Sequence, residues 1–364
     1  MKVVNRIAIV GTVGVPGTYG GFETLAENLV RYHAAQGRAE VLAVYCEAAA
    51  YPDRPARFLS AELRYVPLKA NGVQSIPYDI WSLCHAVCRG TDVILLLGVS
   101  GALALPLLRL VSRARIVTNI DGIEWKRDKW SGLAKWVLRL SERLAVRWSH
   151  AVVADNQAIA EHVQASYGAR CEVIAYGGDH ALATAPADEA VRGLPELYAL
   201  ALCRIEPENN VAMILEAFAA MPDRALVFVG NWDKSEYGRT LRARYGDKPN
   251  LYLLDPVYEP ARLRRVRDGA WLYVHGHSAG GTNPSLVEMM QFGVPVVAHG
   301  CAFNRYSTEH GALYFETVAE LQAVVGGLDD DTAVAVGERM GEIARRRYTW
   351  AEIGRAYFAL MDKQ

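Results

Sequence analysis

The chain has no excess of either charge and no paired-cysteine motif. Its 364 residues carry 39 basic and 40 acidic side chains, for a formal net charge of -1, so the composition does not indicate a nucleic-acid partner. The 6 cysteines are scattered, mostly in apolar runs, without a CxxC pair. Buried thiols in a reducing compartment therefore explain them better than a metal site or a disulfide framework.

Long uninterrupted hydrophobic runs are also missing. The most apolar stretch, 93–111, is broken by Gly98, Gly101, Pro106 and Arg109, whereas a membrane-spanning helix needs about 20 consecutive apolar residues. We expect a buried strand, a turn and a short helix there. No secretory signal precedes the first apolar strand, so we expect a cytoplasmic location.

The stretch 271–300 has the pattern of a buried strand, a glycine-rich turn and a helix. Apolar strand-forming residues occupy 271–274, and small and polar residues follow as far as Thr282. Asn283 is a suitable N-cap, and Pro284 is a suitable first helical residue. The sequence therefore predicts a helix that begins directly after the turn.

The turn before this helix favours an anionic ligand. Gly280 and Gly281 let a ligand approach the backbone closely, and the N–H groups of a first helical turn point towards it. A phosphate is the simplest such ligand, and the Glu288 carboxylate is placed to accept hydrogen bonds from sugar or ribose hydroxyls. The alternative is an ordinary βαβ unit in which the glycines only make a tight turn.

A second glycine loop follows the first expected strand. The sequence GTVGVPGTYGG occupies 11–21 and leads into a helix that Gly37 ends. This arrangement also favours an anion, but its spacing is not GxGxxG. A dinucleotide site in this loop, with Glu47 at the end of the second strand as the ribose ligand, stays open as an alternative.

Strands and helices alternate along the chain, and the pattern restarts near its midpoint. Residues 180–196 are rich in Ala, Pro and acidic side chains with no clear period, which is typical of a domain boundary. The predicted fold is α/β, with two Rossmann-like doubly wound domains facing a cleft. We expect these domains at 1–177 and 178–347, with a helix at 348–364 that packs back on the first.

Polar side chains at strand ends are further candidates, because ligands of open parallel sheets bind beyond the carboxyl ends of the strands. Asp121 and Glu124 follow one such strand and are able to bond sugar hydroxyls or to take a proton from an acceptor hydroxyl. Asp121 alternatively only makes a turn with Gly122. Arg204 follows a strand of the second domain, where its guanidinium is suited to a diphosphate.

The segment 125–148 is basic, amphipathic and rich in tryptophan. Lys135, Arg139, Arg143 and Arg147 recur every four residues beside an apolar face. Such a segment is able to lie on an anionic membrane surface. A solvated face on a helix that covers a sheet explains the period equally well.

Four collinear motifs resemble those of a known family. They are IVGTVGVPGTYGGFETLAENLV from Ile9, NIDGIEWKRDKW from Asn119, CRIEPENN from Cys203 and HGHSAGGTNPSLVEMM from His275. Together they resemble the retaining glycosyltransferases of GT-B fold, and among these the bacterial rhamnosyltransferase-like group. The resemblance covers nearly the whole chain.

The resemblance implies roles for individual residues. Glu288 matches the second glutamate of the family's Glu-x7-Glu motif, and Gly280 stands where the family has the first. Arg204 matches a diphosphate-binding arginine, while Asn209 replaces the family's lysine, so backbone N–H groups have to contribute more. Asp121 aligns with the histidine of the family's catalytic loop.

The implied site residues fall into three groups. The catalytic group is Asp121, Glu288 and Arg204. The donor-binding group is Tyr19, Gly20, Gly21, Arg204, Asn209, Ser278, Gly280, Gly281, Thr282, Asn283 and Glu288. The acceptor-side group is Glu124 and Trp125.

The implied activity is transfer of a sugar from a nucleotide-sugar donor with retention of configuration. The resemblance points to L-rhamnose from dTDP-rhamnose. The implied acceptor is a saccharide or lipid-linked saccharide at the cytoplasmic face of the inner membrane, in surface polysaccharide biosynthesis. No DxD-type carboxylate pair stands at a strand end, so we expect no metal and no other cofactor. An NAD-dependent oxidoreductase, a sugar-nucleotide epimerase of the same fold and a non-catalytic scaffold are the alternatives.

Overall fold

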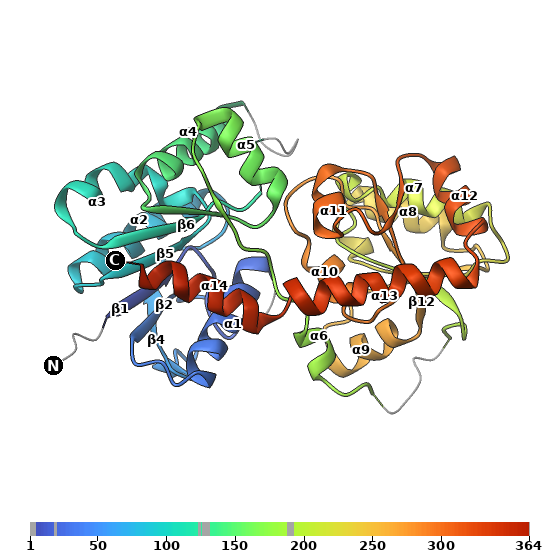
Figure 1. Cartoon of the computed structure of the whole chain (residues 1–364), viewed down its shortest axis with the longest axis horizontal. Coiled ribbons are helices and arrows are strands. Elements are labelled where there is room, and N and C mark those ends of the chain that lie inside the picture. Colours follow the sequence, from blue (N-terminus) through green and yellow to red (C-terminus); the bar gives the residue numbers. More distant parts are fainter. Residues whose placement is uncertain (1–4, 18–19, 123–124, 126–131, 188–192, 364) are drawn as a thin grey trace. The chain divides into compact units, whose positions relative to one another are not determined.

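A computed structural model describes residues 5–17, 20–122, 125, 132–187 and 193–363. The chain forms two compact units, Met1–Ala175 with Trp350–Gln364 (unit 1) and Tyr176–Thr349 (unit 2) (Figure 1). Each unit is a β-sheet, parallel except at one edge of unit 1, with helices packed on it. The predicted α/β class, with two domains, is confirmed.

Unit 1 has an 8-stranded sheet of order β3-β4-β2-β1-β5-β6-β7-β8. Its pairs are parallel except β3 with β4. The central strands are almost wholly apolar, as expected for strands that are covered on both faces. The strands are β1 (Arg6–Val10), β2 (Val41–Glu47), β3 (Arg57–Phe58), β4 (Ala61–Val66), β5 (Val93–Leu97), β6 (Arg115–Asn119), β7 (Ala151–Ala154) and β8 (Glu172–Val173).

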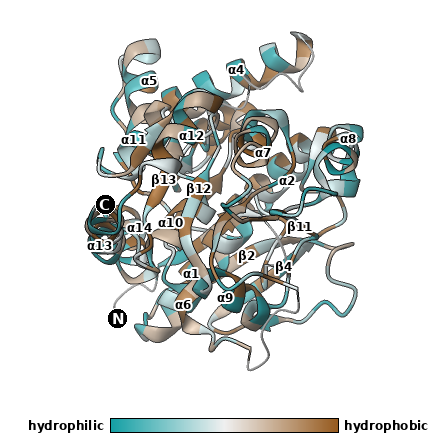
Figure 2. Ribbon diagram, turned by 90° about the vertical axis from the view of Figure 1, so that its right-hand side faces the viewer, coloured by the Kyte–Doolittle hydropathy of each residue, from teal (hydrophilic) through white to brown (hydrophobic). Residues whose placement is uncertain are grey.

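The helices of unit 1 include one from the C-terminus of the chain. Colouring by hydropathy shows brown and teal parts on many of the helix ribbons, as expected for helices that cover a sheet (Figure 2). The helices are α1 (Gly21–Ala35), α2 (Ser75–Cys88), α3 (Leu105–Val111), α4 (Gly132–Trp148), α5 (Gln157–Tyr167) and α14 (Trp350–Asp362), with 3-10 turns at Gly72–Gln74 and Ser100–Ala104.

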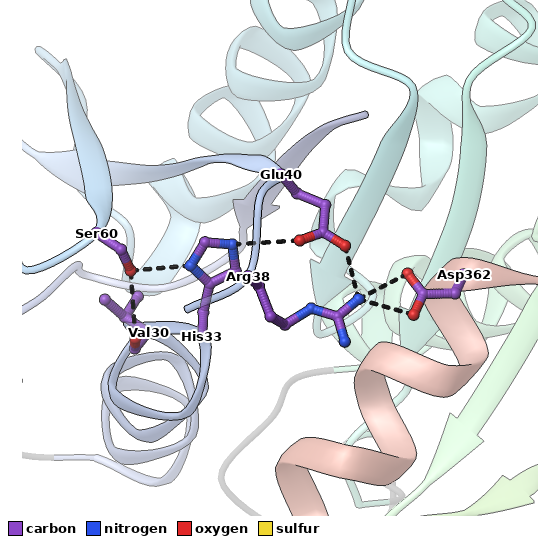
Figure 3. A network of polar contacts seen from close by, with 6 residues as sticks. All are labelled: Val30, His33, Arg38, Glu40, Ser60 and Asp362. Atoms are coloured by element: carbon purple, nitrogen blue, oxygen red, sulfur yellow. Dashed lines mark hydrogen bonds and ion pairs between the residues drawn. The ribbon is translucent and has the colours of Figure 1, made fainter. Parts of the chain in front are cut away.

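Helix α14 packs against α1. The rings of Tyr32 and Phe358 stack with their centroids 5.6 Å apart, and the absence of a side chain at Gly354 makes room for Tyr32. At the end of α14, Asp362 accepts a hydrogen bond of 2.7 Å from Arg38, which also bonds Glu40 at 2.6 Å (Figure 3). These contacts attach the C-terminal helix to unit 1.

Unit 2 has a 6-stranded sheet of order β11-β10-β9-β12-β13-β14, and all of its pairs are parallel. Successive strands are added on one side of β9 and then, from β12, on its other side. The junction of β9 and β12 is therefore the topological switch point of this sheet. The strands are β9 (Tyr198–Leu202), β10 (Leu226–Val229), β11 (Leu251–Leu254), β12 (Ala270–His275), β13 (Val296–His299) and β14 (Leu313–Phe315).

Helices cover the sheet of unit 2 and bury an aromatic core. The rings of Phe228 and Trp232 meet edge to face with centroids 5.2 Å apart, and both side chains are fully buried. The helices are α6 (His180–Ala183), α7 (Val211–Ala219), α8 (Glu236–Tyr245), α9 (Pro260–Asp268), α10 (Pro284–Met290), α11 (Ala302–Ser307), α12 (Val318–Gly326) and α13 (Asp330–Arg347), with 3-10 turns at Pro207–Asn209 and Trp232–Lys234.

The first and last residues of unit 2 are tied together. The backbone N–H of Gly178 donates to the carbonyl of Tyr348 at 2.8 Å, and Gln291, just after α10, donates to the same carbonyl at 2.8 Å. Gly178 also lies so close to the carbonyl of Val287 in α10 that a Cβ there has no room. The segment that enters unit 2 and the segment that leaves it therefore meet beside α10.

In the part of the chain that the structure describes, no helix has both the length and the apolar character to cross a membrane. The apolar stretch 93–111 instead forms β5, a 3-10 turn and α3, as predicted.

Candidate functional site

The loops that follow β9 and β12 meet at the switch point of unit 2. Asn210 donates from its amide to the carbonyl of Gly276 at 2.8 Å. Ser278 donates to the carbonyl of Glu208 from both its backbone N–H at 3.0 Å and its hydroxyl at 2.8 Å. These bonds fix the two loops to each other, so residues predicted from two distant motifs lie in one site.

Arg204 leaves the end of β9 into this site. Its side chain is 38% exposed and its ion pair with Glu206 is long, with 3.7 Å between nitrogen and oxygen. An exposed pair at this distance contributes little. The guanidinium is therefore accessible to an incoming anion.

Asn209 has a different environment from Arg204. It is 3% exposed, donates to the carbonyl of Arg204 at 2.7 Å, and its Oδ1 lies 2.6 Å from Nδ1 of His277. The side chain thus joins the β9 loop to the β12 loop. His277 is not among the residues predicted from the sequence, although a histidine beside a glycine at a strand end is a visible signal.

The turn and helix α10 begin as predicted. Gly280 has a φ of 126°, a backbone conformation that residues other than glycine rarely adopt. The Asn283 side chain accepts from the N–H of Ser285 at 3.0 Å, and Pro284 is the first helical residue. Thr282 is buried, while Ser278, Gly280 and Gly281 are partly exposed. The predicted cap and helix start are confirmed.

Glu288 lies in an ion-pair cluster of unit 2. Its Oε2 contacts the guanidinium of Arg267 on α9, and its Oε1 lies 3.3 Å from Nε2 of His180 on α6. The side chains of Arg267 and Glu288 are only 7% and 12% exposed. Burial alone raises the pKa of Glu288, but the charges and hydrogen bonds of Arg267 and His180 outweigh it and lower the pKa below 4.5.

A buried polar cluster lies at the end of β12. The Tyr273 hydroxyl donates to Oγ of Ser285 at 3.1 Å and lies 3.2 Å from Nδ1 of His275. Burial, together with the neighbouring His277 and His299, lowers the pKa of His275 well below 6.5. Burial thus favours the neutral form of His275, and Tyr273 links this histidine to Ser285 at the start of α10.

The glycine loop of unit 1 is occupied by carboxylates of its own helix. Glu23 accepts from the N–H of Val13 at 2.8 Å, and Glu27 accepts from the N–H of Gly17 at 2.7 Å. The carboxylate of Glu23 also lies against Gly20, where it fills the place of a Cβ. Of the three donor residues predicted here, Gly20 and Gly21 lie at the start of α1, while Tyr19 lies outside the described residues.

The predicted ribose ligand of the dinucleotide alternative is also engaged. Glu47 accepts a hydrogen bond from the backbone N–H of Ala70 at 2.9 Å. A pyrophosphate in this loop would meet two carboxylates in place of unpaired N–H groups.

Asp121 follows β6 of unit 1 with φ 60. Its backbone N–H donates to Oδ1 of Asn119 at 2.9 Å, and the Asn119 amide donates to the Tyr357 hydroxyl of α14 at 2.7 Å. The C-terminal helix therefore supports the strand end that carries Asp121.

Of the acceptor-side residues, Glu124 lies outside the described residues and Trp125 packs on α4. The Trp125 indole donates to Oε2 of Glu142 at 2.9 Å, and the Arg139 guanidinium lies 4.9 Å from the centre of the Trp125 ring. Glu142 is 3% exposed and also accepts from Tyr167 at 2.7 Å.

Two family models match the chain. Residues 188–325 match "Glycosyl transferases group 1", which includes the loops of the unit 2 site. Residues 4–179 match "Domain of unknown function (DUF1972)". No curated protein gives a significant match to the chain.

Solved structures resemble the whole chain. Sucrose-phosphate synthase from Thermosynechococcus elongatus has a TM-score of 0.82 at 15% identity over 98% of both chains. HepE of Anabaena, in complex with UDP and glucose, has a TM-score of 0.71 at 15% identity over 100% of both. A proposed UDP-N-acetylglucosamine 2-epimerase from Listeria monocytogenes has a TM-score of 0.64 at 12% identity over 98% of this chain and 95% of that one.

At these identities the likeness shows the fold, which is that of the GT-B glycosyltransferases. The chain carries a glycosyltransferase group 1 domain in unit 2. Most of unit 1 matches the domain of unknown function.

Proposed function

We propose that the protein is a glycosyltransferase that moves a sugar from a nucleoside-diphosphate donor to a saccharide or lipid-linked saccharide. The observation that supports this most is the bonding of the β9 and β12 loops at the switch point, with the accessible Arg204, inside the region that matches glycosyl transferases group 1. The proposed donor is dTDP-L-rhamnose, with retention of configuration, in surface polysaccharide biosynthesis.

The chemistry needs a group that stabilises the leaving diphosphate. The bond from the anomeric carbon to the phosphate oxygen breaks, the bond to the acceptor oxygen forms, and the acceptor proton passes to the departing phosphate. Arg204 is proposed to bind the negative charge that develops on the departing phosphate oxygen, which is electrostatic stabilisation by a preorganised donor. The N–H groups of 280–282 supply the remaining donors, because Asn209 is neutral and already bonded to both loops.

The carboxylates of Asp121 and Glu288 are proposed to bind sugar hydroxyls. Asp121 orients the acceptor or the donor sugar from unit 1. Glu288 accepts a hydrogen bond from a hydroxyl of the donor sugar through Oε1, the oxygen that also contacts His180. The contact with His180 is weaker and more exposed than the contact with Arg267. Neither residue has to act as a base, because the departing phosphate takes the proton.

The oxidoreductase and the epimerase alternatives differ in how well they agree with the structure. The dinucleotide site of an oxidoreductase is disfavoured by Glu23 and Glu27, whose carboxylates already bind the loop N–H groups. An epimerase shares the fold, as the Listeria protein illustrates. It differs in turning over the nucleotide-sugar without an acceptor.

Ligand stabilisation of the purified protein tests the donor. A ligand that binds only the native state raises the melting temperature, so dTDP-, UDP- and GDP-sugars and NAD(H) are compared. We expect dTDP-rhamnose to stabilise the wild type and Arg204→Ala to lose the effect, while Arg262→Ala, at an exposed arginine of α9 in the same unit, keeps it. Stabilisation by NAD(H) alone would contradict the proposal.

Product analysis separates transferase from epimerase. Incubation of the stabilising nucleotide-sugar without acceptor is expected to leave its configuration unchanged. Release of the nucleotide with transfer to a saccharide or lipid-linked saccharide supports the transferase, and an epimerised sugar nucleotide supports the alternative.

The proposal places the protein at the cytoplasmic face of the inner membrane. A lipid-linked acceptor is presented at that surface, and the basic segment 125–148 is the part of the chain proposed to contact it. We further propose that transfer requires no metal ion.

A further inference from the structure

The most exposed apolar side chains of unit 1 include a group on α3 and α4. On α3, Leu107, Leu110 and Val111 are 66%, 79% and 67% exposed. On α4, Leu133 and Trp136 are 74% and 62% exposed. The two helices contact each other, and we call these five exposed side chains the α3–α4 surface.

An apolar stripe of α3 is exposed to solvent. Leu105 and Leu108 are the buried leucines of this helix, and Leu107, Leu110 and Val111 have the i, i+3, i+4 spacing of the opposite face. A helix that only covers a sheet has polar residues in these places. A row of large exposed apolar side chains indicates that something else covers them.

Among the described residues of α3, α4 and the turn after α3, the exposed charged side chains are of one sign. Arg109 and Arg113 are exposed at the end of α3, and Arg139, Arg143 and Arg147 are exposed on α4. The acidic residue of α4, Glu142, is 3% exposed and bonded to Trp125 and Tyr167. The chain as a whole has a net charge of -1, so basic charge is concentrated on this surface.

We propose that the α3–α4 surface docks on an anionic lipid membrane, with the leucines of α3 and the Leu133–Trp136 turn of α4 entering the headgroup region and the arginines pairing with lipid phosphates. Basic side chains beside exposed leucines and a tryptophan are the pattern of interfacial membrane helices. A nucleic acid would pair with the arginines through its phosphates but would leave the leucines in water. A lipid surface accepts both.

The contact proposed here extends the one made by the segment 125–148 to the exposed leucines of α3. It rests on the proposed function only for its purpose, which is to hold unit 1 beside a lipid-linked acceptor. Vesicle binding itself needs neither donor nor acceptor, so it fails or succeeds independently of sugar transfer.

Co-sedimentation with vesicles tests the proposal on the full chain. The wild type is expected to bind vesicles of equal parts phosphatidylglycerol and phosphatidylcholine, to bind pure phosphatidylcholine far less, and to lose binding as salt is raised. Leu107→Ser with Leu110→Ser is expected to weaken binding at least about tenfold. Arg143→Gln with Arg147→Gln is expected to weaken it about 30-fold, from two basic side chains near the surface.

Matched controls lie in unit 2. Val334→Ser removes a side chain that is 60% exposed on α13, and Lys248→Gln with Arg262→Gln removes two exposed basic charges. Both are expected to bind vesicles as the wild type does. A melting temperature within the wild-type range shows that each variant is folded.

Leu133→Ser with Trp136→Ser on α4 is a second test of the apolar contact.

Three outcomes would overturn the proposal. One is wild-type protein that does not bind the anionic vesicles. Another is vesicle binding that the α3 and α4 variants leave unchanged. The third is a dimer in analytical ultracentrifugation that Leu107→Ser with Leu110→Ser dissociates, because the surface would then be an interface between two copies of the chain.

Discussion

Replacing Glu288 by glutamine tests whether this carboxylate stabilises unit 2 in addition to its proposed contact with the donor sugar. In the structure its partner Arg267 is 7% exposed and Glu288 itself 12%, so the variant leaves a buried guanidinium without its counter-charge. Breaking a buried ion pair in this way costs about 3–5 kcal/mol. The second partner, His180, is 36% exposed, and its contact is worth less than about 1 kcal/mol.

We therefore expect Glu288→Gln to lower the free energy of unfolding of unit 2 by about 3 kcal/mol. For a domain of this size that is a fall in melting temperature of roughly 6–12 °C. Urea unfolding followed by tryptophan fluorescence measures the free energy, and donor binding is measured separately. His180→Gln is the matched control and is expected to change stability by less than about 1 kcal/mol.

The stability that the Glu288 carboxylate gives to unit 2 is expected to depend on pH. Because the pKa of Glu288 is lowered in the folded state from 4.5, its contribution to stability is present above the unfolded pKa and is lost as the pH falls through the folded pKa. The difference between wild type and Glu288→Gln is expected to be constant near neutral pH and to shrink below pH 4.5.

A double variant separates structure from ligand binding. Arg267→Met with Glu288→Met removes both charges and is expected to recover most of the lost stability, because apolar side chains replace buried pairs at little cost. Wild-type stability in Glu288→Gln together with lost donor binding would refute the reasoning and make the carboxylate a sugar ligand alone.

Three further outcomes are expected. Asn283→Ala removes the N-cap of α10 and is expected to cost about 1 kcal/mol of unfolding free energy in urea titration, whereas Asn283→Asp keeps most of it; equal stability of the two would contradict the capping role. Tyr357→Phe leaves the buried Asn119 amide without its acceptor, so thermal unfolding should report a loss of about 1–3 kcal/mol, accompanied by slower transfer because the Asp121 turn loses its support; unchanged kcat would remove Asp121 from the mechanism. Excess EDTA is expected to leave the transfer rate unchanged, and an activity that returns only with added Mg²⁺ would show that Arg204 does not suffice.

Regular elements with a clear period could be predicted from the sequence. The strand, turn and helix of 271–300 were predictable because Asn283 and Pro284 carry local signals for a cap and a first turn, which act within a few residues. The elements that were not predicted are very short. Strand β3 has 2 residues, α6 has 4 and α11 has 6, and none of them is long enough to show a period.

The orientation of α3 could not be predicted for a different reason. Nearly every position of this helix is apolar, so the pattern does not distinguish the face of Leu108, which is buried, from that of Leu110, which is 79% exposed. The packing of the helix in the folded protein decides it.

Contacts between distant residues were also beyond sequence patterns. Arg267 and Glu288 are 21 positions apart on two helices, and no spacing rule connects them. The roles of Glu23 and Glu27 are a milder case. Acidic residues in the first turns of a helix are common because of its dipole, and their use as acceptors for the preceding loop is visible only in three dimensions.

The bond between Gly178 and Tyr348 makes unit 2 an insertion with adjacent ends. Unit 1 is continued by α14 after the chain leaves unit 2, so the whole group 1 domain is one continuous segment between two neighbouring points. A segment of this kind is exchangeable as a single cassette, because its replacement leaves the two junctions close together. Recombination at these two points would join the same unit 1 to a different unit 2 in one event.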